Sequence, residues 1–200
     1  FEYPELGVVT ANELHIPVDR PVAFTLISDD VIHSFWVPAL GGKTDMFPGR
    51  ETRMTLAPTD PGIYRGQCAE FCGASHALMA FETVVMPPDE FDQWLSAEAR
   101  GAKPPQGALA QAGATLFLEE GCGACHTIRG TKAIGKTGPD LTHLANRHSL
   151  AAGTLPLNAQ AIARWIGHTD TIKPEVNMPT YDFLSDDDLA ALAAYLGGLK

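Results

Sequence analysis

The stretch QCAEFCGASHALM, residues 67–79, places two cysteines, a glutamate, a histidine and a methionine within thirteen positions. Thiolate, imidazole and thioether groups are ligands that soft transition metals prefer. Cys72, His76 and Met79 follow one another in the order of a loop that holds a single copper ion. A histidine from an earlier strand would complete such a site, and His33 in DVIHSFW is the obvious donor. The stretch therefore predicts a metal site in a domain built from strands.

Cys68 is surplus to a site with one copper ion. It precedes Cys72 by four residues, so a tight loop can direct both sulfurs at one point. Two thiolates can bridge two copper ions, and each ion then takes one histidine, His33 or His76. Met79 supplies one weak axial ligand, and a backbone carbonyl between the cysteines supplies the other. The second thiol thus predicts a binuclear copper centre, which relays electrons with little change of geometry.

A second cysteine pair lies in CGACH, residues 122–126, which has the C-x-x-C-H pattern of c-type haem attachment. The thiols of Cys122 and Cys125 can each form a thioether to one haem vinyl group, and His126 then lies under the iron. The C-x-x-C spacing also occurs in redox and zinc sites. Here, however, the motif stands at the end of a predicted helix, which favours the haem interpretation.

The order of motifs over residues 107–200 resembles that of the class I cytochromes c. GPDL (138–141) follows the haem motif, and NMP (177–179) precedes the last predicted helix. The resemblance implies that Met178, the only methionine after residue 86, is the sixth iron ligand. It also implies that the Pro139 carbonyl accepts a hydrogen bond from the ligand histidine. The remaining histidines of this half are expected at the surface or at the propionate edge: His143, His148 and His168.

Three segments of the first half, DVIHSFWVP, KTDMFPGR and GQCAEFCGASHALM, resemble the CuA domain of cytochrome c oxidase subunit II, a cupredoxin β-barrel. The resemblance implies two bridging thiolates, two terminal histidines, and axial ligation by a methionine and by the Glu70 carbonyl. The implied copper ligands are His33, Cys68, Glu70, Cys72, His76 and Met79. It further implies that the Glu70 side chain reaches a magnesium ion at the interface with subunit I. A CuA domain followed by a cytochrome c domain matches the caa-type oxidases.

The hydrophobic pattern divides the chain into two domains. Short β-type runs separated by turn residues predict an all-β barrel or sandwich, and they lie at 13–18, 22–28, 51–57, 62–67 and 80–86. PPDEFDQWLSAEA (87–99) predicts one helix, on which Trp94 packs against the barrel. RGAKPPQG (100–107) predicts a linker stiffened by paired prolines. The periodicity is then helical, with a capping box at Ser185 and Asp188. The expected domains are 1–99 and 108–200, the second all-α.

Charge separates the two halves as well. Residues 1–96 contain 14 acidic and 5 basic side chains, a formal charge of −9, whereas residues 97–200 contain 10 and 9, a formal charge of −1. An acidic surface argues against nucleic acid as a partner and allows attraction of a basic protein. The resemblance implies two partners: oxidase subunit I, and an electron donor that is a soluble cytochrome c or a bc-type complex.

The chain begins at Phe1 without a signal peptide, and no run approaches the ~18 apolar residues of a membrane span. Members of the resembled family have N-terminal membrane helices that this chain lacks, so we expect a soluble fragment of a membrane-anchored subunit. Attachment of haem through C-x-x-C-H occurs outside the bacterial cytoplasmic membrane. The expected location is therefore the periplasmic or extracytoplasmic face of that membrane.

Three alternatives stay open on the sequence. The four cysteines could form disulfides, but both pairs are local and would close very short loops, which stabilise little. The chain could bring electrons into a haem–copper nitric oxide reductase instead of an oxygen-reducing oxidase. It could also be a copper-carrying module, although a carrier needs exchangeable ligands and this loop has a full coordination set.

Overall fold

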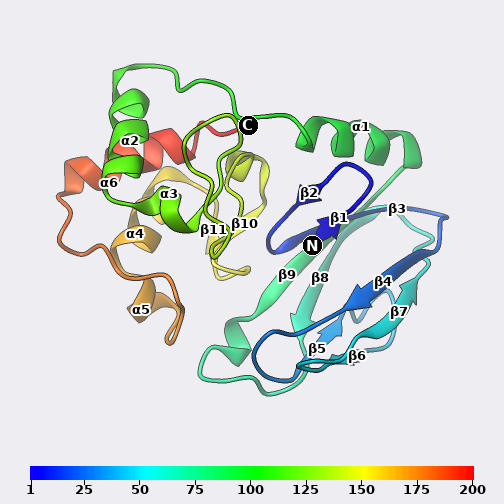
Figure 1. Cartoon of the computed structure of the whole chain (residues 1–200). Helices are drawn as coiled ribbons and strands as arrows, with labels where there is room; N and C mark the ends of the chain where they lie inside the picture. The colour runs from blue at the N-terminus through cyan, green and yellow to red at the C-terminus, as the bar shows by residue number, and fades with distance from the viewer. The chain divides into compact units, whose positions relative to one another are not determined.

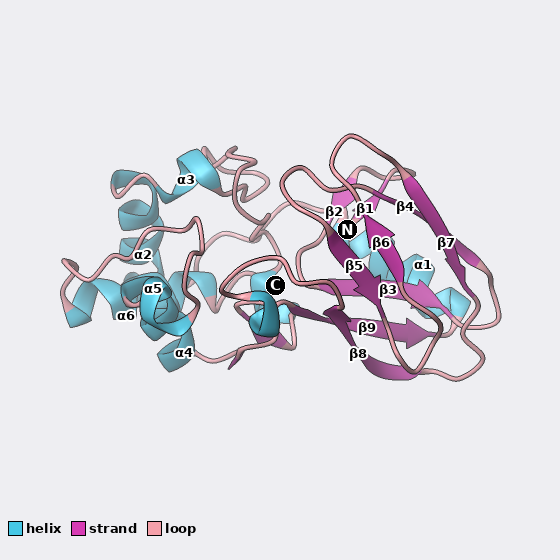
Figure 2. Cartoon of the chain, turned by 90° about the horizontal axis from the view of Figure 1, so that it is seen from below, coloured by secondary structure: helices cyan, strands magenta, loops and turns pink.

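The computed structural model describes all residues from Phe1 to Lys200 and divides the chain into two compact units. The first unit consists of Phe1 and Asn12–Ala97, and the second of Glu2–Ala11 and Glu98–Lys200. The longer strands lie in the first unit, and all but one of the α-helices lie in the second (Figures 1 and 2). No helix combines the length and the apolar character that crossing a membrane requires. The two-domain fold class expected from the sequence, β-rich and then helical, is confirmed.

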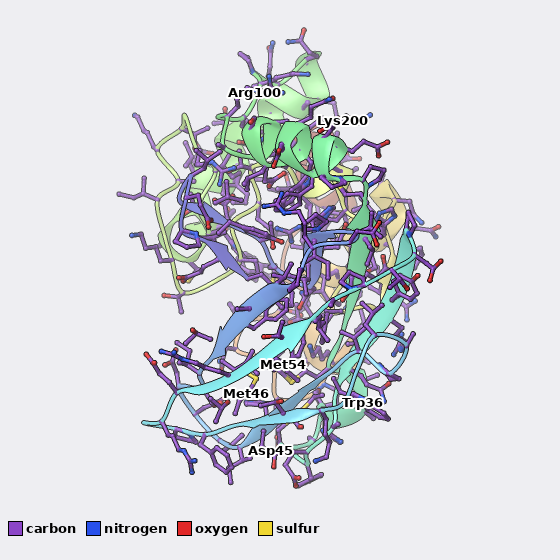
Figure 3. The ribbon with its side chains drawn as sticks, turned by 90° about the vertical axis from the view of Figure 1, so that its right-hand side faces the viewer. Trp36, Asp45, Met46, Met54, Arg100 and Lys200 are labelled. Atoms are coloured by element: carbon purple, nitrogen blue, oxygen red, sulfur yellow. The ribbon has the colours of Figure 1, made fainter.

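The first unit contains a five-stranded sheet and a two-stranded sheet. The strands are β3 (Glu13–Pro17), β4 (Val22–Leu26), β5 (His33–Trp36), β6 (Thr44–Met46), β7 (Thr52–Leu56), β8 (Gly62–Cys68) and β9 (Ala80–Met86). The larger sheet has the order β3-β9-β8-β5-β6, with β3 parallel to β9 and the other pairs antiparallel. β4 pairs with β7, and β7 lies beside the edge strand β6, so Met54 and Met46 come from neighbouring strands (Figure 3). Ile16, Val37 and Leu56 are almost completely buried and mark the core.

Helix α1 (Pro88–Glu98) contacts β3 of the larger sheet. The Trp94 ring stacks on the His15 ring of β3, with centroids 4.0 Å apart and an interplanar angle of 7°. The His15 imidazole is also 3.4 Å from the Glu13 carboxylate, and both side chains are nearly buried. The prediction that Trp94 packs this helix onto the barrel is confirmed.

The helices of the second unit surround one apolar core. They are α2 (Ala108–Glu119), α3 (Cys122–Cys125), α4 (Ala159–Gly167), α5 (Thr169–Ile172) and α6 (Asp186–Leu196). Two hairpins of two-residue strands accompany them: β1 (Glu2–Tyr3) with β2 (Val8–Val9), and β10 (Ser149–Leu150) with β11 (Leu155–Pro156). Single turns of 3₁₀-helix lie at His76–Leu78 and Leu144–Asn146.

The crossing of α2 and α6 depends on a glycine. A Cβ atom at Gly113 would lie 2.0 Å from the Ala191 carbonyl oxygen of α6, so the two backbones approach closely at this point. One turn further along α2, the Phe117 ring meets the Tyr195 ring edge-on at 5.8 Å. The first and last long helices of this unit, α2 and α6, therefore form a closely packed pair that supports α3 and its haem motif.

The capping box predicted at the start of α6 is confirmed. Ser185 Oγ accepts a hydrogen bond from the Asp188 amide at 3.2 Å, and the Asp188 carboxylate accepts from the Ser185 amide at 3.3 Å. The reciprocal bonds satisfy amides that the first turn of any helix leaves unpaired. This fixes where α6 begins, directly after the segment that carries Met178.

The segment that follows α1 is bound to the second unit. The Arg129 guanidinium donates to the Glu98 carbonyl at 2.5 Å and forms an ion pair with Asp140 at 2.5 Å. His143 Nε2 donates to the Arg100 carbonyl at 3.0 Å, and the Ala102 amide donates to the Arg129 carbonyl at 2.8 Å. His143 was expected at the surface or the propionate edge. It is instead 8% exposed, because it is used to hold this segment.

Candidate metal centre and haem attachment site

The sheet brings His33 and Cys68 together. His33 is the first residue of β5 and Cys68 the last of β8, and these antiparallel strands pair Phe35 with Cys68. The loop after Cys68 returns to β9, and the Cys68 amide donates to the Met79 carbonyl at 2.9 Å. This bond closes the loop at its base, so all side chains of the loop project from one end of the β unit. The fold therefore gathers residues that are up to 46 positions apart in sequence, from His33 to Met79.

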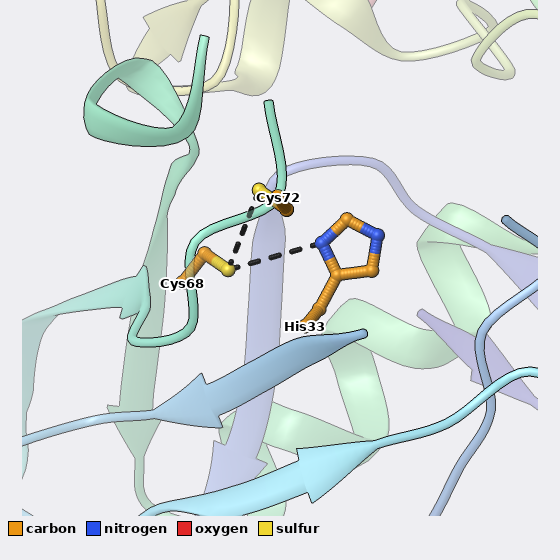
Figure 4. A group of neighbouring side chains, drawn as sticks. All are labelled: His33, Cys68 and Cys72. Carbon is orange, nitrogen blue, oxygen red and sulfur yellow. Dashed lines mark hydrogen bonds between the residues drawn. The ribbon is translucent and has the colours of Figure 1, made fainter. Parts of the chain in front are cut away.

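The donor atoms of this end lie within a few ångströms of one another. Cys68 Sγ is 3.7 Å from Cys72 Sγ and 3.8 Å from His33 Nδ1 (Figure 4). Cys72 Sγ is in turn 3.5 Å from His76 Nδ1 and 3.7 Å from Met79 Sδ. Each thiol thus has the other thiol and one imidazole nitrogen as neighbours, and the arrangement of the two halves is nearly symmetrical.

The spacings fit metal ligation. Two atoms that one tetrahedral ion holds at the usual sulfur and nitrogen bond lengths lie roughly 3.5–3.8 Å apart. The donor atoms of His33, Cys68 and Cys72 all lie within 4.8 Å of one another, and none of these side chains is fully exposed. The cysteines form no disulfide. The donor set, two thiols with imidazole and thioether, is one that suits copper.

The backbone of Glu70 belongs to this site, whereas its side chain is exposed. Cys68 Sγ lies 3.1 Å from the Glu70 carbonyl oxygen, whereas Met79 Sδ lies 3.7 Å from Cys72 Sγ. The donor set is therefore completed by a carbonyl near one sulfur and by a thioether near the other. The Glu70 residue as a whole is exposed, so its carboxylate is available to groups outside the chain.

The surroundings of Cys68 and His33 change the pKa values of both side chains. Burial, the largest single effect, raises the pKa of Cys68, but hydrogen bonds with the backbone at Glu70 and Ser34 and with His33 lower it to about 7. Burial lowers the pKa of His33, yet its hydrogen bonds to Asp30 and Cys68 more than offset this, so the pKa is raised. A thiol that ionises near neutrality is ready to bind a cation.

Sequence reasoning missed Asp30. Its carboxylate accepts a hydrogen bond from His33 Nε2 at 2.8 Å, and this bond is the main cause that lowers the pKa of Asp30. The spacing Asp-x-x-His in DVIH was a usable signal, because a histidine ligand commonly donates its second ring nitrogen to a carboxylate.

The haem motif forms its own turn of helix. Cys122 and Cys125 lie in α3, which begins after Gly121 in the left-handed conformation (φ 76°), and His126 follows in extended conformation. His126 Nδ1 donates to the Pro139 carbonyl at 2.8 Å, which leaves Nε2 free for an iron. A Cβ at Gly138 would lie 2.6 Å from the His126 ring. The GPD segment therefore suits a haem histidine in two ways. The Pro139 carbonyl accepts the hydrogen bond, and Gly138 has no side chain that would clash with the ring.

Two side chains of the haem motif, Cys122 and His126, are partly buried, whereas Cys125 is exposed. Burial raises the pKa of the Cys122 thiol, and burial also lowers the pKa of His126, partly opposed by its bond to the Pro139 carbonyl. An imidazole kept neutral by its surroundings is the form that binds a metal. The neutral histidine suits ligation of a haem iron.

Met178 lies in the segment between α5 and α6 and packs, half-buried, against the core of the second unit. Its carbonyl accepts a hydrogen bond from Thr169 Oγ1 at 3.0 Å, and Thr180 Oγ1 donates to the Gly167 carbonyl at 2.5 Å. The two bonds tie the backbone at Met178 and the side chain of Thr180 to residues 167–169. Of the other histidines of this unit, His148 and His168 are exposed.

Two family models match separate parts of the chain. Residues 5–86 match the family model "Cytochrome C oxidase subunit II, periplasmic domain", and residues 110–200 match the model "Cytochrome c". The whole chain aligns with cytochrome c oxidase subunit 2 of Alkalihalophilus pseudofirmus at 40% identity and with that of Bacillus subtilis at 37% identity.

The chain spans 58% and 59% of the length of these two relatives. Among solved structures, the periplasmic domain of subunit II of cytochrome oxidase (CoxB) of Bradyrhizobium japonicum is 34% identical with a TM-score of 0.42. That alignment covers 48% of this chain and 70% of the other.

Proposed function

Because residues 5–86 belong to the family of periplasmic domains of cytochrome c oxidase subunit II and residues 110–200 to the cytochrome c family, we propose that this chain carries electrons into a haem–copper terminal oxidase. The two families imply copper and haem as cofactors. The chain itself would contribute electron transfer alone, and the reduction of oxygen would take place in another subunit. The relatives at 40% and 37% identity support this, since both are named as subunits of a cytochrome c oxidase.

The copper ligands in this proposal are the six residues expected from the sequence. Cys68 and Cys72 would hold two copper ions together with His33 and His76. Met79 and the Glu70 carbonyl would complete the donor set. A thiolate-bridged pair of coppers would supply one-electron chemistry with little change of geometry. The observation that carries the proposal is the pair of sulfurs 3.7 Å apart, each with its own imidazole nitrogen at 3.8 or 3.5 Å.

The haem ligands follow from the second unit. Cys122 and Cys125 would attach one haem c covalently, and His126, through Nε2, and Met178 would hold its iron. Histidine–methionine ligation leaves no open coordination position, which suits electron transfer rather than oxygen binding. Pro139 holds the His126 ring in the required orientation through the 2.8 Å hydrogen bond.

The assembly around the chain is part of the proposal. Subunit I would receive the electrons, and a soluble cytochrome c or a bc-type complex would donate them. The family description of the first unit as a periplasmic domain supports a location on the outer face of the cytoplasmic membrane. The exposed Glu70 carboxylate would reach a magnesium ion at the interface with subunit I. Consumption of oxygen rather than nitric oxide by the intact complex would distinguish an oxidase from a nitric oxide reductase.

The copper count tests the proposal directly. We expect the full chain to bind two copper ions, and Cys68→Ser to bind only one, because the remaining residues still form a site with one thiolate, two imidazoles and a thioether. Ala77→Ser in the same loop is the matched control, since Ala77 is exposed and is not one of the proposed ligands. Metal analysis and the absorption spectrum provide the measurement. A wild-type chain that saturates at one copper would rule out the binuclear centre.

A further inference from the structure

The proposed copper ligands are adjoined by a chain segment that none of the ligand assignments includes. The segment between β4 and β5 contains Ser28, Asp30 and Val31, and it ends at His33. Within it, one carboxylate oxygen, Asp30 Oδ1, accepts three hydrogen bonds. The donors are Ser28 Oγ at 3.1 Å, the Val31 amide at 2.6 Å and His33 Nε2 at 2.8 Å.

These bonds fix the carboxylate although it is open to water. The Asp30 side chain is 71% exposed, whereas that of His33 is only 13% exposed. Ser28 Oγ also approaches the Val31 carbonyl at 2.5 Å, which tightens the turn around Asp30. The carboxylate is thus held by its own turn and not by burial, and its position is set by the short stretch 28–31.

The consequence for His33 is a single tautomer. A neutral imidazole has one N–H donor and one acceptor nitrogen. Because a carboxylate accepts the hydrogen bond at Nε2, the proton of His33 is on Nε2 and the lone pair is on Nδ1. Nδ1 is the atom that lies 3.8 Å from Cys68 Sγ. The turn therefore presents the correct nitrogen to a metal before any metal binds.

His76 has a different environment. Its Nδ1 lies 3.5 Å from Cys72 Sγ, but its ring is faced by Phe71, with centroids 5.8 Å apart. Phe71 is an exposed apolar ring, and no carboxylate of the chain is hydrogen bonded to His76. The two imidazoles of an otherwise nearly symmetrical donor set thus differ by one negative charge.

We propose that Asp30 is a positioning residue for the copper site, which fixes His33 as an Nδ1 ligand and makes it more electron-donating than His76. The inference rests on the proposed function, since it concerns how the chain holds the copper ions. A carboxylate bonded to a ligand imidazole raises the basicity of that ligand and stabilises the more positive, oxidised site. The two halves of the centre would then be electronically unequal because of a residue that touches neither metal.

The test compares Asp30→Asn and Asp30→Ala in the full chain. Asparagine keeps an acceptor oxygen for Ser28, Val31 and His33 and removes only the charge, whereas alanine also removes the acceptor. We expect Asp30→Asn to raise the reduction potential of the copper site and to weaken copper binding. For Asp30→Ala we expect copper binding weaker by about 10–100-fold, as is usual when the partner of a ligand is lost.

Asp29→Asn is the matched control, because it removes the same charge from the adjacent exposed position. Copper affinity by chelator competition, the potential by spectroelectrochemistry, and hydrogen exchange at His33 Nε2 in the copper-loaded chain are the readouts. Faster exchange at His33 in Asp30→Ala, with His76 unchanged, would support the proposal. If Asp30→Asn and Asp30→Ala both behave as Asp29→Asn does, Asp30 has no positioning effect. If the wild-type chain does not take up two coppers, the proposed function fails instead.

Discussion

The geometry of the loop lowers the pKa of the Cys68 thiol, and this pKa can be measured. In the folded chain its pKa is about 7, against an ordinary value of 9.0, because hydrogen bonds from its neighbours outweigh the effect of burial. A cysteine reacts as its thiolate, so the fraction of Cys68 that reacts depends on this pKa. The Cys122 thiol provides a contrast, since burial raises its pKa.

We therefore expect alkylation of Cys68 in the metal-free, haem-free chain to become half-maximal near pH 7, well below the pH at which Cys122 reacts. The folded-state pKa of Cys68 is depressed, so the ionised thiol adds stability above its unfolded pKa near 9.0, and this is lost as the pH falls through about 7. Iodoacetamide labelling resolved by mass spectrometry measures each site. Equal profiles for the two cysteines would contradict the geometry described for the loop.

At the scale of single residues, the sequence reveals donors but not their partners. The cysteines, His76 and Met79 could be assigned because they lie close together in sequence and are chemically rare. Asp30 was missed because aspartate is common in turns, and only the fold shows that its oxygen meets His33 Nε2. His143 was misplaced for a related reason. Nothing in its neighbours along the chain shows that the Arg100 carbonyl, 43 residues earlier, would bury it.

At the scale of elements, the crossing of α2 and α6 is a contact that a single substitution is expected to disturb. Replacing glycine by alanine inside a helix ordinarily stabilises it by roughly 0.5–1 kcal/mol. At Gly113 the added Cβ would lie 2.0 Å from a backbone oxygen of α6, which cannot rotate away as a side chain can. The helices would have to separate, and overpacking of this kind costs about 1–3 kcal/mol.

Gly113→Ala is therefore expected to lower the stability of the second unit, by up to about 2.5 kcal/mol after the gain in helix propensity is subtracted. Gln111→Ala, at an exposed position of the same helix, is the control and should change the stability little. Thermal unfolding followed by circular dichroism is the measurement. A stabilised Gly113→Ala variant would show that α2 and α6 do not cross as closely as described.

The longer elements were predictable because their patterns are local. The strands β3, β4, β7, β8 and β9 all fall within runs that alternate or are rich in branched residues. β5 and β6, by contrast, have four and three residues, too few for a period to register, although His33 was expected on a strand. The hairpins β1–β2 and β10–β11 consist of two-residue strands. Their existence depends on partners and on the turn between them, which includes Ala151 and Ala152 at positive φ in the second hairpin.

At the scale of the whole molecule, the segment between the domains is not a uniform tether. Its first residues are held to the second unit by Arg129 and His143, whereas no secondary structure forms from Gly101 to Gln106. Paired prolines stiffen the remainder. If both proposed redox sites are loaded, a covalent link of this length would keep them at an effective concentration on the order of 1 mM or above. Transfer between the two halves of the chain would then be an intramolecular step and would not require two separate molecules to meet.

Charge predicts where an external donor delivers its electrons. Residues 97–200 have a formal charge of −1 and residues 1–96 a formal charge of −9, so a basic donor is attracted strongly only to the copper half. If external electrons arrive first at the cytochrome c domain, reduction should depend weakly on salt. Direct delivery to the copper half would slow steeply as ionic strength rises, because exposed charges are screened beyond about 8–10 Å.

Stopped-flow reduction of the loaded chain by a basic cytochrome c, with the haem and copper bands followed separately at several salt concentrations, distinguishes the two routes. We expect the haem band to change first, at a rate that alters little with salt. Reduction of the copper band before the haem band, with a steep salt dependence, would show that the acidic domain receives electrons directly.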